Sequence, residues 1–458
     1  MDIKRISFIE VRSPESYIFR RFPIPRVGSV LLSTILSKMG FEVKVFIEDI
    51  CRPDWSFVES SDVVCISTIT STVSTAYKTA AGLKKLGIPV IMGGAHPSFR
   101  PEECLGFADF VVRGEGDIAL PKIINYLRTG APDISTIAGV SYKTSEGTVK
   151  HNPSGEFIQD LDSLPDVDFS LIYKWKNSNI HPVATMRGCA YNCRFCLVSP
   201  MFGRKYRFRS VKSVTDELKR IAAVSSSPLF FVDDNFAANR TRTKQIIRFM
   251  LEERITPRWS AMMRPNVVKD EELLSLMAQV GKFTACLGFE SITPETLVAY
   301  DKKQTHQDNI ASVKALKDHG IKVHGMFVLG ADTDTVESIR KTVDFASDSG
   351  IDSVQFMILT PLPGTPVYDE LQNAGRILHT QWDKYDIHHT VFTPAQMTPS
   401  ALHMETLYSM KRFYSWKYVF KRIVTLDLFY AAFGIYVKNI IRHAVKEAKK
   451  YVTDFKLK

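Results

Sequence analysis

The chain has 458 residues, 45% of them hydrophobic, and a formal net charge of +10 at pH 7. This length predicts two or three domains, and the hydrophobic fraction is ordinary for a globular protein with a substantial core. We find no run of about eighteen uncharged apolar residues, so we expect no transmembrane helix. Seven cysteines in a chain of this length, with no expected signal peptide, disfavour a secreted disulfide framework.

The first third of the chain alternates short apolar strands with helices. The strands are predicted at Ile6–Val11, Val43–Ile47, Val63–Ser67, Val90–Met92 and Phe110–Val112, and the helices at Gly28–Met39, Ser74–Leu86 and Ala119–Leu127. Because strands and helices of this length alternate, we expect residues 1–135 to form a doubly wound, Rossmann-like α/β domain with a mainly parallel sheet.

Three loops at the carboxyl ends of these strands carry small and polar residues. Ligands of open parallel sheets bind beyond the carboxyl ends of the strands, where glycines allow close backbone approach and hydroxyls form hydrogen bonds. The candidate binding residues in these loops are Ser67, Thr68, Gly93, Gly94, His96, Glu115 and Gly116.

A connector over residues 136–180 follows, with a predicted β-hairpin at Gly139–His151. A second strand–helix series then covers residues 181–370. Its strands are predicted at Val183–Met186, Leu229–Asp233, Trp259–Met263, Phe283–Gly288, Val323–Leu329 and Val354–Leu359, and its helices at Val211–Val224, Thr243–Glu253, Glu271–Val280, Gln307–Gly320 and Val336–Ser349. Six such units fall short of the eight of a closed barrel.

Three cysteines, Cys189, Cys193 and Cys196, follow the first strand of this series at C-x3-C-x2-C spacing. Three closely spaced thiolates can ligate three irons of a four-iron cluster, which normally takes four cysteines, so the fourth iron keeps an open position. A structural zinc would need a fourth ligand at a typical spacing, and none follows. A thiolate-bound cluster favours a reducing compartment, so we expect a cytoplasmic protein.

The segment Met186–Leu197, with Phe195 just before the last cysteine, resembles the signature of radical S-adenosylmethionine (SAM) enzymes. The resemblance implies an open, partial (β/α)6 barrel in which Cys189, Cys193 and Cys196 are the catalytic metal ligands and hold a [4Fe-4S] cluster that binds SAM. The SAM contacts that it implies are Phe195, Asp233, Asp234, Arg264, Gly288 and Glu290.

In this resemblance the acidic pair receives the SAM ammonium, Arg264 its carboxylate and Glu290 the ribose hydroxyls, while Gly288 allows close approach of the adenosyl group. The residues alone leave other interpretations open. Asp233 and Asp234 can cap the next helix, and Arg264 or Glu290 can belong to a surface ion pair.

Over roughly residues 1 to 130, the polar loops resemble the cobalamin-binding domain that precedes the radical domain in one radical SAM subfamily. The variant that ligates cobalt carries Asp-x-His-x-x-Gly after its first strand, whereas this chain has Arg12–Phe22 there, and its first histidine is His96. We therefore expect that no protein histidine is the lower ligand of the cobalt. The alternative that the domain has lost its cofactor is also kept. For His96, a corrin contact and a hydrogen-bonded loop histidine both stay open.

The positive charge is concentrated in the tail. From Lys411 to Lys458 there are 12 Lys and Arg against three acids, a balance of +9, which leaves 47 basic and 46 acidic residues in the rest of the chain. This distribution argues against a nucleic-acid groove spread over the protein. We predict that residues 371–458 form an α-helical, basic region, and its interleaved aromatic residues fit either an interfacial membrane contact or a helical cap on the barrel.

The resemblance implies a radical SAM enzyme with a [4Fe-4S] cluster, SAM and cobalamin as cofactors. It would cleave SAM to a 5′-deoxyadenosyl radical and, through methylcobalamin, methylate an unactivated carbon of a lipid, isoprenoid, tetrapyrrole or natural product. Ring closure, C–C coupling or oxidation, with or without cobalamin, is the first alternative, and a non-catalytic iron–sulfur sensor or scaffold is the second. The expected partners are an electron donor such as flavodoxin or ferredoxin and a small-molecule substrate. A peripheral membrane contact through the basic C-terminal region is a further interpretation that we keep.

Overall fold

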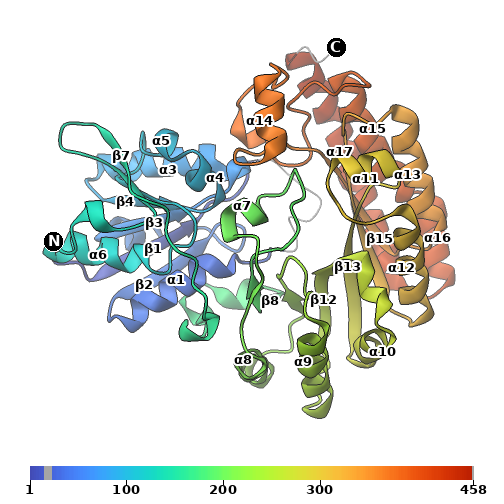
Figure 1. The fold of residues 1–458 in the computed structure, drawn as a ribbon, viewed down its shortest axis with the longest axis horizontal. Coiled ribbons are helices and arrows are strands. Elements are labelled where there is room, and N and C mark those ends of the chain that lie inside the picture. The colour runs from blue at the N-terminus through green and yellow to red at the C-terminus, as the bar shows by residue number, and fades with distance from the viewer. Residues whose placement is uncertain (15–22, 456–458) are drawn as a thin grey trace. The chain divides into compact units, whose positions relative to one another are not determined.

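The computed structural model describes residues 1–14 and 23–455, and it divides into two compact units. The first unit comprises Met1–Ala190 and Leu197–Ser213, and the second comprises Tyr191–Cys196 and Val214–Lys458. Each unit is built around a β-sheet that helices flank (Figure 1).

The first unit contains a seven-stranded sheet with the strand order β2-β1-β3-β4-β5-β6-β7. These strands are β1 (Arg5–Glu10), β2 (Glu42–Ile47), β3 (Val63–Ser67), β4 (Val90–Gly93), β5 (Phe110–Val112), β6 (Val140–Lys143) and β7 (Val149–His151). Strands β1 to β5 pair in parallel, whereas β5, β6 and β7 pair antiparallel. The predicted parallel sheet and the predicted hairpin are therefore confirmed.

The long helices of this unit, α1 (Val27–Lys38), α3 (Val73–Lys85) and α6 (Ala119–Thr129), are those that the apolar periodicity predicts. Helix α1 buries Val30 and Leu36 and ends before Gly40, which adopts a φ of +93°. The short helices α2 (Trp55–Glu59), α4 (Ala95–Phe99) and α5 (Pro101–Cys104) are missing from the prediction, because so few residues carry no helical period.

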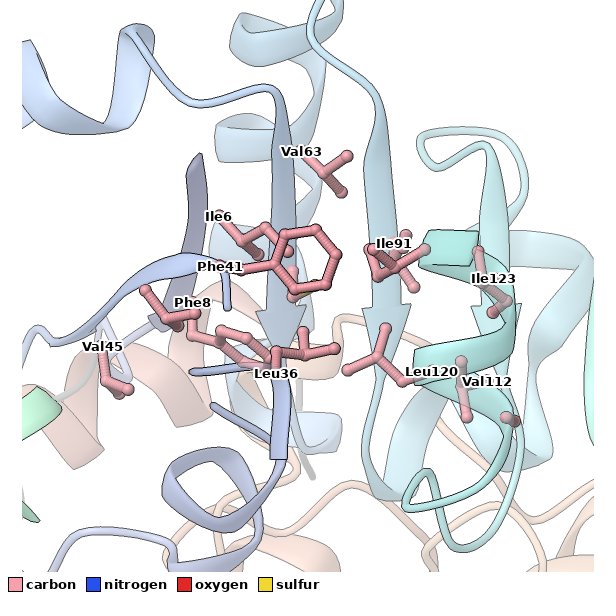
Figure 2. Close-up of a cluster of buried hydrophobic side chains, with 14 of the residues drawn as sticks. Ile6, Phe8, Leu36, Phe41, Val45, Val63, Ile91, Val112, Leu120 and Ile123 are labelled. Carbon is pink, nitrogen blue, oxygen red and sulfur yellow. The ribbon is translucent and has the colours of Figure 1, made fainter. Parts of the chain in front are cut away.

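A buried apolar cluster joins the sheet of the first unit to α1 and α6 (Figure 2). Ile6 and Val45 come from neighbouring strands, Leu36 from α1 and Ile123 from α6, and each is fully buried. Burying one such side chain stabilises a fold by about 1.5–3 kcal/mol. This core holds the strands in register, so the loops at their carboxyl ends lie along one edge of the sheet.

The second unit contains five neighbouring parallel strands in the order β15-β14-β13-β12-β11. Their bounds are β11 (Leu229–Phe231), β12 (Arg258–Met263), β13 (Lys282–Glu290), β14 (Lys322–Leu329) and β15 (Ser353–Ile358). The helices of the series are α8 (Val211–Val224), α9 (Arg240–Glu252), α10 (Glu271–Gln279), α11 (Pro294–Ala299), α12 (His306–Asp318) and α13 (Val336–Asp348). The predicted alternation of parallel strands and helices is confirmed.

The prediction of one strand at Val183–Met186 is wrong. The chain forms two short strands there, β8 (His181–Val183) and β9 (Met186–Arg187), and β9 pairs antiparallel with β10 (Arg207–Phe208). The residues between them bond to Arg209 instead: its N–H donates to the Thr185 carbonyl at 3.0 Å and its guanidinium to the Ala184 carbonyl at 2.9 Å. The interruption lies just before the cysteine loop.

The C-terminal region is helical, as predicted, with α14 (Pro366–Asn373), α15 (Pro399–Phe413), α16 (Trp416–Val424) and α17 (Leu428–Asp454). The carboxylate of Asp352, at the amino end of β15, is fully buried and accepts from Arg422 of α16 at 2.7 Å and from Lys317 at 2.8 Å. This ion cluster fastens α16 to the amino ends of the strands. Among the described residues, no helix combines the length and the apolar character needed to cross a bilayer.

Candidate functional site

The cysteine loop lies between β9 and α7 (Val198–Phe202), and no disulfide joins its three thiols. In the first unit, the Cys189 N–H donates to the Gly203 carbonyl at 3.2 Å. In the second, the Cys196 N–H donates to the Cys193 carbonyl at 3.0 Å and closes a turn. Within residues 1–14 and 23–455, no group of three His, Cys, Asp or Glu is arranged to hold a single metal ion. A cubic cluster instead takes each thiolate on a different iron. Three thiols in one short loop, none of them in a disulfide, fit that donor set, and these cysteines would hold the cluster.

The residues between Cys193 and Cys196 anchor the loop to the second unit. The ring of Phe195 lies edge-on to Tyr300, with 5.0 Å between the ring centroids. The Arg194 N–H donates to the Tyr300 carbonyl at 3.2 Å, and the Val367 N–H donates to the Arg194 carbonyl at 3.4 Å. The aromatic residue of the motif therefore packs on a buried tyrosine, which the sequence analysis missed.

Three charged groups act electrostatically on the Cys193 thiol. Burial raises the pKa of Cys193, the positive charges of Lys302 and Arg264 oppose this rise, and the negative charge of Glu290 adds to it. The Arg264 guanidinium also lies 3.6 Å from the ring centroid of Tyr191, inside the cysteine loop. Because the thiolate is the form of cysteine that binds metal, the two cations favour the liganding state.

The predicted SAM contacts Arg264, Gly288 and Glu290 come together around Lys302. Arg264 donates to the Lys302 carbonyl, and the Lys302 ammonium lies 2.6 Å from a Glu290 oxygen. A side chain in place of Gly288 would meet both charged groups, at 2.6 Å from Glu290 Oε1 and 3.0 Å from Lys302 Nζ. In the sequence, nothing in the pair Lys302-Lys303 distinguishes the buried lysine from the exposed one.

The acidic pair Asp233-Asp234 follows β11, at the carboxyl end of its strand. Asp233 is buried, whereas Asp234 reaches solvent, yet desolvation and the charge of Asp233 raise the pKa of Asp234 to about 7. Asn239 caps α9 through a hydrogen bond from the Arg242 N–H, so the alternative that the acidic pair caps this helix is wrong. Two close carboxylates are a suitable receptor for an ammonium group.

In the first unit, the loops after β3 and β4 approach each other closely. The Thr68 N–H donates to the Gly93 carbonyl at 3.0 Å, and the hydroxyls of Thr68 and Thr72 lie 2.8 Å apart. Gly94 has a φ of +109°, and a Cβ there would collide with the Thr68 carbonyl. Ser67, at the end of β3, is half-buried and its carbonyl accepts from Arg26 at 3.3 Å. This compact polar rim, at the carboxyl edge of a parallel sheet, fits the place expected for a corrin ligand.

His96 lies in α4 with a side chain that has no exposed surface. Its ring nitrogens lie 3.3 Å from the Thr70 hydroxyl and 3.5 Å from the Tyr77 hydroxyl. Burial lowers the pKa of His96 to about 3, so the ring is neutral. Of the two interpretations, the structure favours the hydrogen-bonded histidine over a corrin contact through the side chain. Most of the segment Arg12–Phe22, where the cobalt-ligating variant has its histidine, lies outside the described residues.

Glu115, in the loop after β5, belongs to a buried ion network. Its oxygens lie 2.5 Å from Arg207, 3.3 Å from Arg187 and 3.2 Å from the Ile158 N–H. Arg187 also pairs with Asp117 at 2.8 Å. The carboxylate predicted as a cobalamin contact therefore holds β9 and β10 to the β5 loop. The neighbouring Gly116 packs against Leu32, where a Cβ would come within 3.3 Å.

These features define a class of protein, in which a doubly wound α/β unit precedes a parallel β/α unit and three cysteines lie close together in one loop. Two family models match the chain, the Radical SAM superfamily over residues 183–346 and the B12 binding domain over residues 20–124. The uncharacterized methyltransferase PH0819 of Pyrococcus horikoshii is 31% identical over 392 residues, which cover 83% of each chain.

Two further proteins add to this picture. The bacteriochlorophyllide d C-12(1)-methyltransferase of Chlorobaculum tepidum is 26% identical over 421 residues, 90% of this chain and 87% of that one. Among solved structures, the radical SAM methyltransferase TsrM of Kitasatospora setae, with cobalamin and a [4Fe-4S] cluster bound, has a TM-score of 0.68 at 22% identity. It covers 81% of this chain and 78% of that one, and at this identity the likeness shows the fold alone.

The chain therefore belongs to the cobalamin-dependent radical SAM methyltransferase family. The predicted fold class and the prediction of a radical SAM enzyme are confirmed, and so are the cofactors expected for it, a [4Fe-4S] cluster, SAM and cobalamin. The alternative of a non-catalytic sensor or scaffold is not supported.

Proposed function

We propose that this protein methylates an unactivated carbon of a large or apolar substrate, namely a tetrapyrrole, lipid, isoprenoid or other natural product. The observation that carries the proposal is a charged cluster beside the cysteine loop, in which Arg264 lies 3.6 Å from the ring centroid of Tyr191 and the Lys302 ammonium lies 2.6 Å from Glu290. Relatives named as bacteriochlorophyllide d methyltransferases favour the tetrapyrrole end of this range.

In this proposal the chain's own residues bind and orient SAM. Cys189, Cys193 and Cys196 would hold the cluster, which would supply the electron for the reductive cleavage of SAM to methionine and a 5′-deoxyadenosyl radical. Asp233 and Asp234 receive the ammonium of SAM, whose charge relieves the repulsion between them. Arg264, fixed by its stacking on Tyr191, receives the carboxylate, and Glu290 accepts from the ribose hydroxyls.

The first unit would hold cobalamin through Ser67, Thr68, Gly93, Gly94 and Gly116, at the carboxyl ends of β3, β4 and β5. Cobalamin, methylated by a second SAM, would supply the methyl group there. The close approach of Gly94 to Thr68 fixes the shape of this rim, so its backbone groups are preorganised for a ligand.

The test is an anaerobic purification from cobalamin-fed cells, followed by incubation with SAM, a reductant and a panel of tetrapyrroles and polyprenyl lipids. We expect corrin absorbance, 5′-deoxyadenosine and a product heavier by one CH2. Flavodoxin or ferredoxin, the proposed electron donors, should replace the chemical reductant. A protein with an intact cluster that yields no 5′-deoxyadenosine contradicts the proposal.

A second outcome on the same architecture is supported by a specific relative. The anaerobic magnesium-protoporphyrin IX monomethyl ester cyclase of Rubrivivax gelatinosus is 26% identical over 367 residues. Ring closure would give a product that has lost hydrogen and gained no methyl group. Product mass therefore separates cyclisation or oxidation from methylation in the same incubation.

The tail motivates a separate proposal on location, that the protein contacts anionic membrane surfaces through α16 and the start of α17. Exposed large apolar side chains gather there, and we call them the C-terminal apolar patch: Trp416, Phe420, Ile423, Val424, Leu426, Leu428, Phe429 and Ile435. Phe420 is 62% exposed and Leu426 is 84% exposed, and the exposed Lys417 and Lys421 lie next to them. Aromatic and apolar groups flanked by lysines suit the interface of an anionic bilayer.

Flotation with phosphatidylcholine vesicles, with and without phosphatidylglycerol, tests this contact. We expect binding to anionic vesicles that falls with salt and is lost in the double variant Phe420→Glu, Leu426→Glu. The matched control is Leu86→Glu with Val224→Glu, two apolar residues that are equally exposed elsewhere (59% and 83%). Equal binding by both double variants, or none by the wild type, contradicts the proposal.

A further inference from the structure

Lys302 is a buried lysine on the loop between α11 and α12. Its side chain is 8% exposed, and its ammonium lies 2.6 Å from the equally buried carboxylate of Glu290. A lysine is almost never buried unless it is paired, and a buried pair is often no more stable than apolar residues of the same size. The pair is thus weak evidence for a role in stability alone.

The backbone on both sides of this pair is strained. Asp301 and Lys303 have φ angles of 51° and 53°, and Glu290 has a φ of 62°, next to a register shift in β13. Residues with a Cβ seldom adopt this left-handed conformation, and such strain tends to gather at functional sites. Here the two turns flank Lys302, whose side chain meets Glu290 while its carbonyl accepts from Arg264.

The pair lies against the residues of the candidate site. It covers Gly288, where an added Cβ would reach Glu290 Oε1 at 2.6 Å and Lys302 Nζ at 3.0 Å. Arg264, which donates to the Lys302 carbonyl, lies 3.6 Å from the ring centroid of Tyr191 in the cysteine loop, and the positive charges of Lys302 and Arg264 both lower the pKa of Cys193. One ammonium group therefore orients a predicted ribose ligand and also lies in the electrostatic field of a cluster ligand.

We propose that Lys302 is a positioning residue, which holds the Glu290 carboxylate ready for the ribose of SAM and places a positive charge beside the cysteine loop. This inference rests on the proposed function. Reduction adds a negative charge to a cluster, so a nearby cation raises its reduction potential. Replacing Lys302 by methionine leaves Glu290 negative and uncompensated, which lowers the potential and lets the carboxylate move away from the ribose.

The experiment compares Lys302→Met with Lys302→Arg and with Lys303→Met in the reconstituted full-length protein. Lys303 is the matched control, because it is the adjacent lysine and its side chain is 70% exposed. The readouts are the cluster midpoint potential from an EPR-monitored redox titration and the SAM dissociation constant from anaerobic equilibrium dialysis. We expect Lys302→Met to have a lower potential and about tenfold weaker SAM binding, with Lys302→Arg and Lys303→Met close to the wild type.

Each result of this comparison either supports or overturns the inference on Lys302. If Lys302→Met matches the wild type in potential and SAM affinity, or if Lys303→Met changes both as much, the inference is wrong. Should Lys302→Met fail to fold, the variant Lys302→Met with Glu290→Gln removes both charges, and wild-type SAM affinity in it would also overturn the inference. A wild-type protein that takes up no cluster or binds no SAM contradicts the proposed function itself, which separates that failure from this one.

Discussion

Glu115 is predicted as a cobalamin contact, yet its carboxylate is committed to a buried ion network, and a single substitution separates the two roles. The variant Glu115→Gln keeps the shape of the side chain and removes its charge. The Arg207 guanidinium, only 6% exposed, then loses its counter-ion. Arg187 keeps its pair with Asp117 at 2.8 Å.

Removing one partner of a buried pair destabilises a protein by about 3–5 kcal/mol. We expect the lower end of this range for Glu115→Gln, because Arg207 keeps the carbonyls of Ile158 and Phe202 at 2.7 and 2.9 Å as acceptors. Glu102 is the matched control: its side chain is 76% exposed and pairs with His151 at 3.2 Å. Glu102→Gln should cost less than about 1 kcal/mol.

Urea unfolding of the full chain, followed by circular dichroism, gives the change in stability, and the visible spectrum of protein from cobalamin-fed cells gives corrin content. We expect Glu115→Gln to unfold at lower urea while the folded fraction still carries corrin. An unchanged urea midpoint together with lost corrin absorbance would refute the structural role and make this carboxylate a cofactor ligand.

Three further changes test other parts of the chain. Cys193→Ala should lower iron content and abolish SAM cleavage, with Cys51→Ala, outside the motif, unchanged in both assays; retained cleavage would contradict the assigned cluster. Gly94→Ala should destabilise the first unit by more than about 1 kcal/mol, because φ is +109° and the Cβ meets backbone. In contrast, Gly82→Ala, within α3 and facing open space, should stabilise it by up to about 1 kcal/mol, and equal urea midpoints for the two variants would refute this. The pKa of His96 is lowered to about 3 in the folded protein. Below pH 6.5 the unfolded chain therefore binds a proton at this histidine that the folded protein does not bind. The first unit should therefore lose about 1.4 kcal/mol per pH unit on acidification from 6.5 towards 3, and His96→Gln should flatten this slope in urea titrations at several pH values.

The elements of the fold could be predicted because their signals are local. Strand β3 and helix α8 have the predicted bounds, since β3 is a short apolar run and α8 repeats the apolar residues Val214, Leu218 and Ile221 at helical spacing. The split of β8 and β9 could not be predicted, because it depends on Arg209, a residue more than twenty positions away that bonds the backbone between them. Long-range side-chain contacts with backbone leave no periodic trace.

The residues of the candidate site also divide into those that could be predicted from the sequence and those that could not. Spacing alone singled out Cys189, Cys193 and Cys196, because three thiolates this close in the chain can reach one cluster together. The resemblance named Arg264 and Glu290, but neither spacing nor resemblance identified Lys302. Its role depends on Asp301 and Lys303, which adopt the left-handed conformation. Because neither residue is a glycine, the sequence gives no sign of this conformation.

The arrangement of charge at neighbouring strand ends fits the head group of SAM in a way that single residues do not. Strand β11 is followed by the acidic pair, and Arg264 follows β12, its parallel neighbour. Neighbouring strands lie about 4.8 Å apart, so opposite charges at their ends form an adjacent donor and acceptor for a group that carries both an ammonium and a carboxylate. The next strand, β13, ends in Glu290, the acceptor that we propose for the neutral ribose. The carboxylate of Glu290 must not act as a second ammonium receptor, and its pair with the Lys302 ammonium prevents that by neutralising it. The buried lysine therefore makes the strand end at Glu290 electrostatically different from the strand end at the acidic pair. This difference explains why a costly buried pair lies at this strand end.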